Sequence, residues 1–216
     1  MNYMVYSERL ARKIIELACI REGDTVLDLA CGTGWLSKRL ANRKAKVHGV
    51  DPTPFMLAKA RKKTNGSLSL GIAEALPYHN ESFDAIVCNM AFSHFDCRKA
   101  AGEICRVLKP NGRFVVTDVV DPNPGIYDAF AYYPARTIVK MLWVLSGRPI
   151  DKSRCVYPNT LDPESDRIRS ALGVYMVTNV ELHYDLLGPA SRLKRGCKII
   201  HGIKRSPGIH DKAIGH

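Results

Sequence analysis

One stretch constrains the fold of this chain more than any other. In residues 26–35 an apolar run is followed by two glycines one residue apart and then by an amphipathic segment. This order predicts a strand, a glycine loop and a helix. Gly32 and Gly34 lack a Cβ, so the main chain can adopt positive φ and a ligand can approach it closely. We therefore expect this loop to form part of a ligand site.

The residues around the two glycines argue against two common nucleotide-binding loops. A phosphate-binding loop needs a Lys-Ser/Thr pair after its glycines, and that pair is missing here. The dinucleotide fingerprint needs a third glycine, and Ser37 stands at that position. The stretch instead carries an acid, Asp28, ahead of the glycines. A nicotinamide-dependent oxidoreductase is therefore the least favoured of the functions considered.

Patterns typical of strands and helices alternate as far as residue 120. The continuous β-branched run at 83–89 suits a strand buried on both faces of a parallel sheet, and Thr53 before Pro54 suits a helix start. We expect helices over 7–20, 35–41, from 54 onward and 98–108, and strands over 25–30, 46–50, 67–71, 83–89 and 113–120, with a turn at 110–112. This alternation predicts an α/β doubly wound sheet whose ligand lies beyond the carboxyl ends of its strands.

The alternation stops after residue 120. A turn cluster at 121–125 opens a segment up to about residue 163 that is rich in aromatic residues. A connection of this length within one domain is often functional, so we expect a lid whose Tyr132 and Tyr133 bind substrate. The alternative is a helix stripe packed on the sheet or on the second copy of a homodimer. A short helix over 164–171, an antiparallel strand pair over 174–183 and 196–203, and a frayed tail at 206–216 complete the single domain, 1–216, that we expect.

The composition is ordinary except for its charge. Of the 216 residues, 46% are hydrophobic and 25% charged, and no run approaches the length of a membrane span. No signal peptide pattern is present, so we expect a cytoplasmic protein. The seven cysteines are scattered without a C-x-x-C pair, which favours reduced packing residues, and no metal site is expected. The net charge of +11 could guide the chain to nucleic acid, an anionic membrane or an acidic substrate.

Five segments in order resemble the class I S-adenosylmethionine-dependent methyltransferases, and within them the ubiquinone and menaquinone biosynthesis C-methyltransferases. They are VLDLACGTG at 26–34, GVDPTPFM at 49–56, AEALPY at 73–78, SFDAIV at 82–87 and EICRVLKPNGR at 103–113. One such segment alone is weak evidence, whereas five in register are specific. The resemblance covers residues 24–120 well and the remainder loosely. It implies a Rossmann-like seven-stranded sheet with strand seven antiparallel, and S-adenosylmethionine as the methyl donor.

The resemblance also implies a cofactor site. Asp28 would orient the ammonium group, Asp51 would accept hydrogen bonds from both ribose hydroxyls, and Pro52 and Met56 would flank the adenine, whose edge would meet the Ala73 amide. The implied residues lie at or soon after strand ends: Asp28, Ala30, Gly32, Gly34, Asp51, Pro52, Met56, Ile72, Ala73 and Asn89.

One position departs from the family pattern. Ile72 stands where relatives often have Asp or Asn, which removes a side-chain acceptor for the exocyclic amine of adenine. A water molecule or Glu74 would have to substitute for it. A non-catalytic, S-adenosylmethionine-binding regulatory relative is therefore one alternative function.

Methyl transfer is an in-line displacement at an activated carbon, so the protein has mainly to position the nucleophile and exclude water. If a base takes part, His94 is the best candidate, since it follows the strand at 83–89 and histidine is a common general base in enzymes. The alternative is that His94 caps the next helix or packs under the lid. The aromatic lid favours an aromatic or lipid-like small molecule, methylated at oxygen, nitrogen or carbon. The charge keeps an RNA or protein methyltransferase as the alternative.

Overall fold

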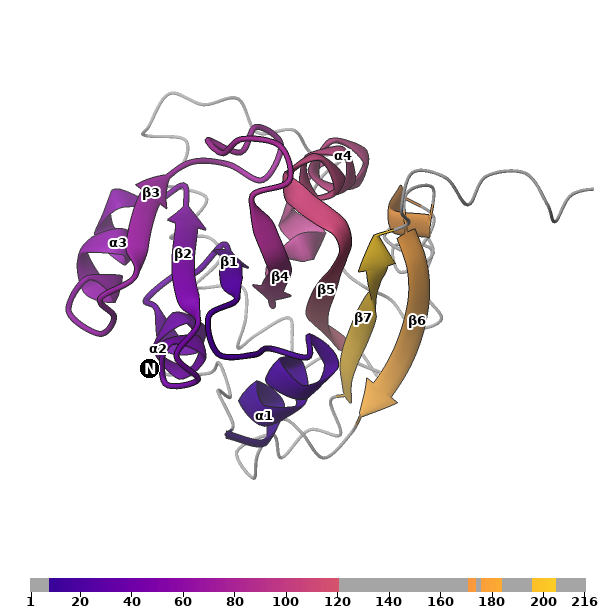
Figure 1. Cartoon of the computed structure of the whole chain (residues 1–216), viewed down its shortest axis with the longest axis horizontal. Helices are drawn as coiled ribbons and strands as arrows, with labels where there is room; N and C mark the ends of the chain where they lie inside the picture. Colours follow the sequence, from indigo (N-terminus) through magenta and orange to yellow (C-terminus); the bar gives the residue numbers. More distant parts are fainter. Residues whose placement is uncertain (1–7, 121–170, 174–175, 184–195, 205–216) are drawn as a thin grey trace, which may run out of the picture.

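The computed structural model describes residues 8–120, 171–173, 176–183 and 196–204 (Figure 1). The helices are α1 (Glu8–Leu17), α2 (Trp35–Ala41), α3 (Pro54–Ala60) and α4 (Cys97–Val107), with the short 3-10 helix η1 (Phe92–His94). The strands are β1 (Thr25–Leu29), β2 (Lys46–Asp51), β3 (Ser67–Leu70), β4 (Phe83–Asn89), β5 (Leu108–Val120), β6 (Met176–His183) and β7 (Gly196–Lys204). The predicted lid with Tyr132 and Tyr133, and the predicted tail, lie outside these residues.

The strands form one seven-stranded sheet in the order β3-β2-β1-β4-β5-β7-β6. Neighbouring strands from β3 to β5 are parallel, while β7 runs antiparallel to both β5 and β6. This confirms the predicted doubly wound α/β sheet with strand seven antiparallel. Because the chain moves outward from β1 to β2 and later returns to place β4 on the other side of β1, the strand order reverses between β1 and β4.

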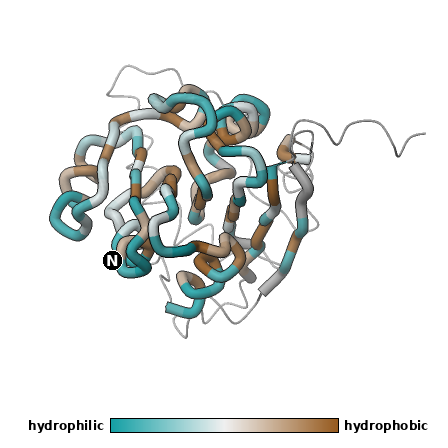
Figure 2. Tube along the Cα trace, in the orientation of Figure 1, coloured by the Kyte–Doolittle hydropathy of each residue, from teal (hydrophilic) through white to brown (hydrophobic). Residues whose placement is uncertain are grey.

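Two apolar clusters, one on each face of the sheet, hold the helices in place. Alternate residues of β1 take part in different clusters, as Leu27 packs with α4 and Val26 packs with α1 and α2. Figure 2 shows hydrophobic residues along the central strands and hydrophilic ones on the outer turns. Most of β4 is buried, as its continuous apolar run predicts. The α2 and β4 bounds equal the predicted ranges.

The turn predicted at 110–112 is a local irregularity within β5 instead. The strand begins at Leu108, which pairs with Phe83, and the next pairing joins Ala85 to Arg113. The extra residues of β5 therefore bulge from the ladder, and Asn111 takes a left-handed φ of 60° there. The prediction that this strand starts at residue 113 was wrong, because the turn residues are accommodated without ending the pairing with β4.

Two helix starts differ in detail from the sequence-based expectation. Thr53 occupies the N-cap position of α3, but its side chain forms no capping hydrogen bond. Its backbone N–H instead donates to Asp51 Oδ1 at 2.9 Å. At α4 the cap is Asp96, whose Oδ1 accepts from the Lys99 N–H at 3.3 Å. Of the helix predicted at 164–171, only the last residue falls within the described part of the chain.

Candidate functional site

A cavity lies at the carboxyl ends of β1, β2 and β4, where the strand order reverses. Its volume is about 160 Å³. The lining residues come from these strand ends, from the glycine loop and from the start of α2: Asp28, Ala30, Cys31, Gly32, Trp35, Leu36, Asp51, Asn89, Met90 and Ala91. The reversal point is where open α/β sheets bind their ligands. Five of the ten residues expected to hold a cofactor line this cavity.

Two non-glycine residues with left-handed backbone conformations lie on the rim of the cavity. Ala30 follows β1 with φ 57°, and Met90 follows β4 with φ 57°. Each is fixed by a hydrogen bond close by, from Cys31 N to Val50 O at 3.0 Å and from Met90 N to Thr117 O at 2.8 Å. Such conformations cost about 1 kcal/mol or more each and cluster at functional sites. Both turns carry the chain sharply off the sheet at the cavity.

The two glycines of the loop have different roles. A Cβ on Gly32 would meet no atom within 4 Å, and the residue has φ 53° and lines the cavity. A Cβ on Gly34 would lie 3.0 Å from the Cβ of Ala60 and 3.1 Å from its Cα. The second glycine therefore permits α3 to pack against the loop. Gly34 was expected to contact a cofactor, but it is not among the residues that line the cavity.

Asp51 joins the glycine loop to the first turn after β2. Its Oδ2 accepts a hydrogen bond from Gly32 N and its Oδ1 accepts one from Thr53 N, both at 2.9 Å. The side chain is nearly buried. A carboxylate oxygen can accept two hydrogen bonds, so both oxygens retain capacity for one more donor. The carboxylate can thus accept from a pair of neighbouring hydroxyls without losing its structural contacts.

Asp28 is a buried carboxyl group at the end of β1. Its Oδ2 accepts from Ser37 Oγ at 2.5 Å, so the residue at the position of the missing third glycine holds this acid. Burial raises the pKa of Asp28 to about 7, although the Ser37 hydrogen bond opposes the rise and the charge of Asp51 adds to it. Among the described residues no cationic side chain pairs with Asp28 or Asp51.

The predicted adenine residues lie outside the cavity lining. Ala73 is buried, whereas Ile72 is 45% exposed. Glu74 was considered as a substitute acceptor for the side chain missing at Ile72. Its Oε1 accepts from the Asp96 backbone N–H at 2.8 Å, so that carboxylate is used at the start of α4. Asn89 does line the cavity, with its Oδ1 accepting from Thr117 Oγ1 at 2.8 Å.

His94 lies at the end of η1 and is exposed. Its backbone N–H donates to the carbonyl of Ala91, a lining residue, at 3.0 Å. The interpretation of His94 as the cap of α4 is wrong, because Asp96 has that role. Its expected role as a base remains a prediction.

Sequence reasoning missed half of the cavity lining. Cys31 was assigned to packing alone; it is buried, and burial raises the pKa of its thiol far above the ordinary range. Trp35 and Leu36 follow the glycines directly, and Met90 and Ala91 follow β4 directly. Their position next to the recognised motifs was the available signal.

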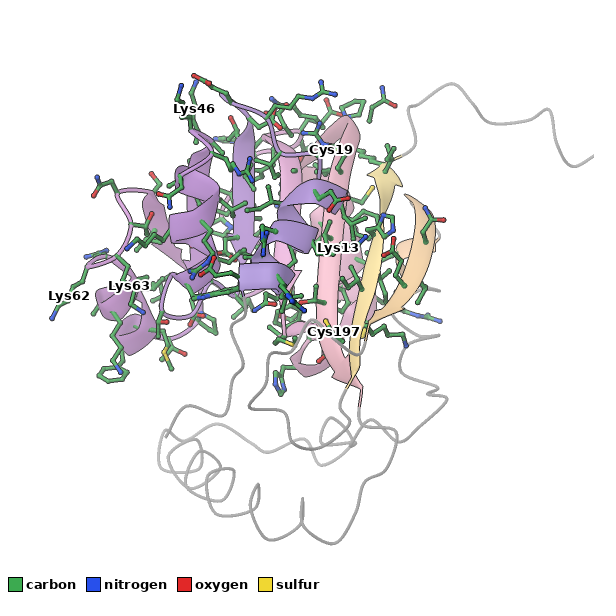
Figure 3. All side chains as sticks on the ribbon, turned by 90° about the horizontal axis from the view of Figure 1, so that it is seen from below. Lys13, Cys19, Lys46, Lys62, Lys63 and Cys197 are labelled. Atoms are coloured by element: carbon green, nitrogen blue, oxygen red, sulfur yellow. The ribbon has the colours of Figure 1, made fainter. Side chains whose placement is uncertain are left out.

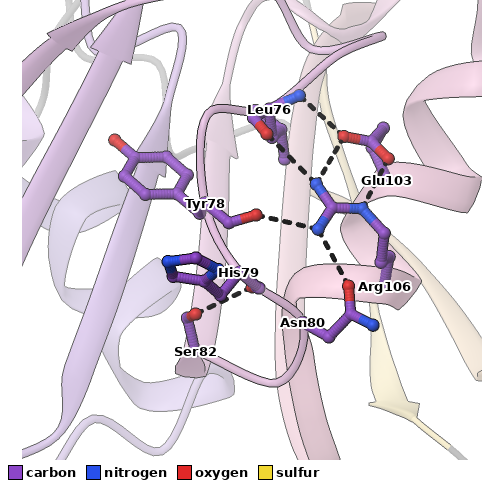
Figure 4. A network of polar contacts seen from close by, with 7 residues as sticks. All are labelled: Leu76, Tyr78, His79, Asn80, Ser82, Glu103 and Arg106. Carbon is purple, nitrogen blue, oxygen red and sulfur yellow. Dashed lines mark hydrogen bonds and ion pairs between the residues drawn. The ribbon is translucent and has the colours of Figure 1, made fainter.

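Two of the recognised segments serve a structural network away from the cavity (Figure 4). The Arg106 guanidinium donates to both oxygens of Glu103 at 2.7 and 2.8 Å, and to the carbonyls of Tyr78 and Leu76 at 2.8 and 3.1 Å. Glu103 in turn accepts from Leu76 N at 2.7 Å, and Asn80 Oδ1 accepts from Arg106 at 3.0 Å. The network fixes the loop between β3 and β4 onto α4.

The described residues contain neither a candidate metal centre nor a membrane-spanning helix. No group of three or more His, Cys, Asp or Glu side chains could hold a metal ion in that part of the chain. None of its helices has the length and apolar character needed to cross a membrane.

Comparisons with known proteins agree with the fold and the motifs. A family model described as a methyltransferase domain matches residues 27–116. The chain is 36% identical over 148 residues to the demethylmenaquinone methyltransferase of Thermus thermophilus, an alignment that covers 64% of this chain and 67% of that protein. It is 29% identical over 203 residues to the ubiquinone/menaquinone biosynthesis C-methyltransferase UbiE of Escherichia coli, with 87% and 79% covered.

A solved structure shares the fold. The crystal structure of the YcgJ protein from Bacillus subtilis matches with a TM-score of 0.62 at 23% identity, covering 91% of this chain and 98% of that one.

Proposed function

Because this chain belongs to the S-adenosylmethionine-dependent methyltransferases, we propose that it methylates a small aromatic acceptor with a lipid-like character, such as the ring of a prenylated quinol. One observation carries the proposal: the cavity at the strand reversal contains two carboxylates, Asp28 and Asp51, that no cation of the described residues neutralises. A ligand with cationic groups and a ribose diol is complementary to such a pair.

The residues of the cavity fit S-adenosylmethionine. When bound, this cofactor supplies a methyl group activated by the positive sulfonium. Asp51 would accept from the ribose hydroxyls through the capacity its oxygens retain. Asp28 would face the ammonium group, and the backbone of Ala30 and Gly32 would lie against the methionine part. Pro52, Met56, Ile72 and Ala73 would surround the adenine.

The chain then has to hold the acceptor and exclude water. Trp35, Met90 and Ala91 line the cavity with largely apolar surface, which favours an aromatic ring over a hydrated group. His94 follows them on η1 and would take the proton from an acceptor hydroxyl. The acceptor class is supported by the relatives named as demethylmenaquinone and ubiquinone/menaquinone methyltransferases.

The cofactor part is tested by titration calorimetry on a matched pair of variants. Asp51→Asn should weaken S-adenosylmethionine binding by about 100-fold, the loss expected for charge-assisted hydrogen bonds to a diol. Asp84→Asn is the control, because Asp84 is also a partly buried carboxylate that accepts a backbone N–H, from Thr25 at 2.9 Å. It lies at the start of β4, at the opposite end of the strands. Its variant should bind within about threefold of the parent.

The acceptor part is tested by methyl transfer from labelled S-adenosylmethionine. Purified full chain should label a demethylmenaquinol analogue, and the Asp51→Asn variant should lose that activity. Labelling of bulk RNA or of a protein mixture, with none of the quinol, would overturn the acceptor class while leaving the cofactor assignment intact. Equal weakening of binding by the two Asn variants would overturn the role of Asp51.

A further inference from the structure

The edge of the sheet beside the cavity has an unusual charge distribution. Residues 52–73, which hold α3 and β3, contain four basic residues and no acidic one. Lys59, Arg61 and Lys62 are exposed and form no ion pair with an acid among the described residues. Lys63 donates to Thr33 Oγ1 of the glycine loop at 3.2 Å.

Two basic residues of α2 and the turn after it do have acidic partners. Arg39 forms an ion pair with Glu8 of α1, and Lys44 forms one with Glu22 at 3.0 Å. Acidic residues from other parts of the chain therefore neutralise some of its basic side chains. At α3 and the turn that follows it, by contrast, none of the four basic residues forms such an ion pair among the described residues.

The same edge exposes its largest apolar side chains. Phe55 is 62% exposed and Leu70 is 59% exposed. Leu70 pairs in register with Asp51, and Phe55 lies in the first turn of the helix that follows Asp51. Both are therefore at the carboxyl ends of the outer strands, beside the cavity that Asp51 lines. The Lys59 ammonium lies 4.1 Å from the centre of the Phe55 ring, so the charged and apolar groups form one surface.

We propose that this surface, made by Phe55, Lys59, Arg61, Lys62 and Leu70 and called the α3 face below, binds the anionic surface of a lipid bilayer. Basic side chains are attracted to anionic headgroups, and exposed aromatic and aliphatic side chains enter the boundary between headgroups and acyl chains. One weak signal gives only marginal membrane binding, whereas an apolar group combined with a basic patch binds more stably. Both signals are present here on one short stretch of the sheet edge.

RNA fits the α3 face less well. Proteins that bind single strands alternate several aromatic platforms with basic residues, whereas the α3 face has a single aromatic ring, that of Phe55. An apolar β-edge residue such as Leu70 contributes nothing to a phosphate contact. Bilayer contact would bring the neighbouring cavity to an acceptor dissolved in lipid, but the binding itself does not depend on the proposed methyl transfer.

The test measures co-sedimentation of the full chain with vesicles. Phosphatidylcholine vesicles are compared with vesicles in which about one third of the lipid is phosphatidylglycerol, at low and high salt. The parent should bind the anionic vesicles at low salt at least about tenfold better than the neutral ones, and high salt should weaken that binding.

A pair of charge-reversal variants separates the α3 face from net charge. Arg61→Glu with Lys62→Glu should lower binding to anionic vesicles by about tenfold or more. Arg9→Glu with Arg12→Glu changes the charge equally on α1, whose Lys13 lies well apart from Lys62 and Lys63 in Figure 3. This control should stay within about threefold of the parent. Phe55→Ser should lose binding about threefold while keeping its salt dependence.

Several results would overturn the proposal: no binding to anionic vesicles at low salt, an equal loss in both charge-reversal variants, or release of the chain from vesicles by a small excess of RNA. Retained S-adenosylmethionine binding shows that each variant is folded. A chain that binds vesicles through the α3 face yet methylates no quinol would keep this proposal and overturn the acceptor class. A chain that methylates detergent-dispersed quinol but does not bind vesicles would overturn the membrane proposal and keep the acceptor class.

Discussion

The two carboxylates at the cavity lack cationic partners among the described residues, whereas Asp84, at the opposite end of the strands, and Glu103, on α4, have them. Asp28 and Asp51 accept hydrogen bonds from a hydroxyl and from backbone amides. Asp84 and Glu103 accept from backbone amides as well, but each also has a cation beside it, Lys109 for the first and Arg106 for the second. Both pairs of residues are carboxylates, and in both pairs each side chain is at least partly buried.

The partners set the protonation of each group. The Arg106 hydrogen bond lowers the pKa of Glu103 despite partial burial. Partial burial raises the pKa of Asp84, but the hydrogen bonds from Lys109 and the Thr25 amide outweigh it and the net shift is downward. At the cavity, burial without a cation raises the pKa of Asp28 instead. Acids with cationic partners stabilise the fold, whereas the buried, unpaired charge of Asp28 weakens it and fits a cationic ligand.

The comparison is tested most strongly by pH at Asp28. Its folded-state pKa of about 7 is raised above the unfolded value, so its stabilising effect is present below about pH 4 and is lost as the pH rises toward 7. Urea unfolding of Asp28→Asn and the parent from pH 4 to pH 8 should show the variant gaining about 3 to 4 kcal/mol relative to the parent. The variant should also lose S-adenosylmethionine affinity. A difference that does not change with pH would contradict the assignment.

Arg106→Ala should have the next largest effect, with the opposite sign. It removes hydrogen bonds to Glu103 and to two backbone carbonyls and leaves a partly buried carboxylate without its cation. The free energy of unfolding should fall by about 2 to 3 kcal/mol. Arg106→Lys keeps the charge without the planar fork and should recover only part of that loss. Equal stability of the Ala variant and the parent in urea would show that the network is dispensable.

Asp84→Asn should mirror Asp28→Asn on a smaller scale. The depressed folded-state pKa of Asp84 means that its stabilising effect is present above about pH 4 and is lost as the pH falls through the folded value. The variant should be less stable than the parent at pH 7 by about 1 kcal/mol, and thermal melts should converge in acid. Divergence in acid would break the proposed contrast between the two aspartates.

Glu22→Gln should change least. The Glu22–Lys44 pair is 3.0 Å long, but both side chains are about 70% exposed. Solvent and salt screen such a pair, so the melting curve should shift by less than about 0.5 kcal/mol. A larger shift would mean that exposure is a poor guide to the strength of ion pairs in this chain.

The helices and strands of residues 8–120 were predictable because their signals are local. The run at Phe83–Asn89 and the glycines before Trp35 each specify structure within a few residues. The extra residues between Leu108 and Arg113 were misjudged, because a bulge within a strand depends on the register with β4. Local turn chemistry contains no information about that register.

The site was predictable in part for the same reason. Asp28, Gly32 and Asp51 follow motifs at strand ends, and they meet at one cavity. The role of Ser37 as donor to Asp28 depends on how α2 packs on β1, and the need for Gly34 depends on the approach of Ala60. Neither contact leaves a signal in spacing or composition. Tyr132 and Tyr133 remain predictions.

The two left-handed turns at Ala30 and Met90 have a further consequence for how this family diversifies. They follow β1 and β4, and the hydrogen bonds beside them reach Val50 of β2 and Thr117 of β5, so the rim depends on four neighbouring strands that all end by residue 120. Insertions or deletions after β5 leave that rim untouched. The part proposed to hold the methyl donor can thus be inherited as a unit, whatever changes in length or sequence occur after β5.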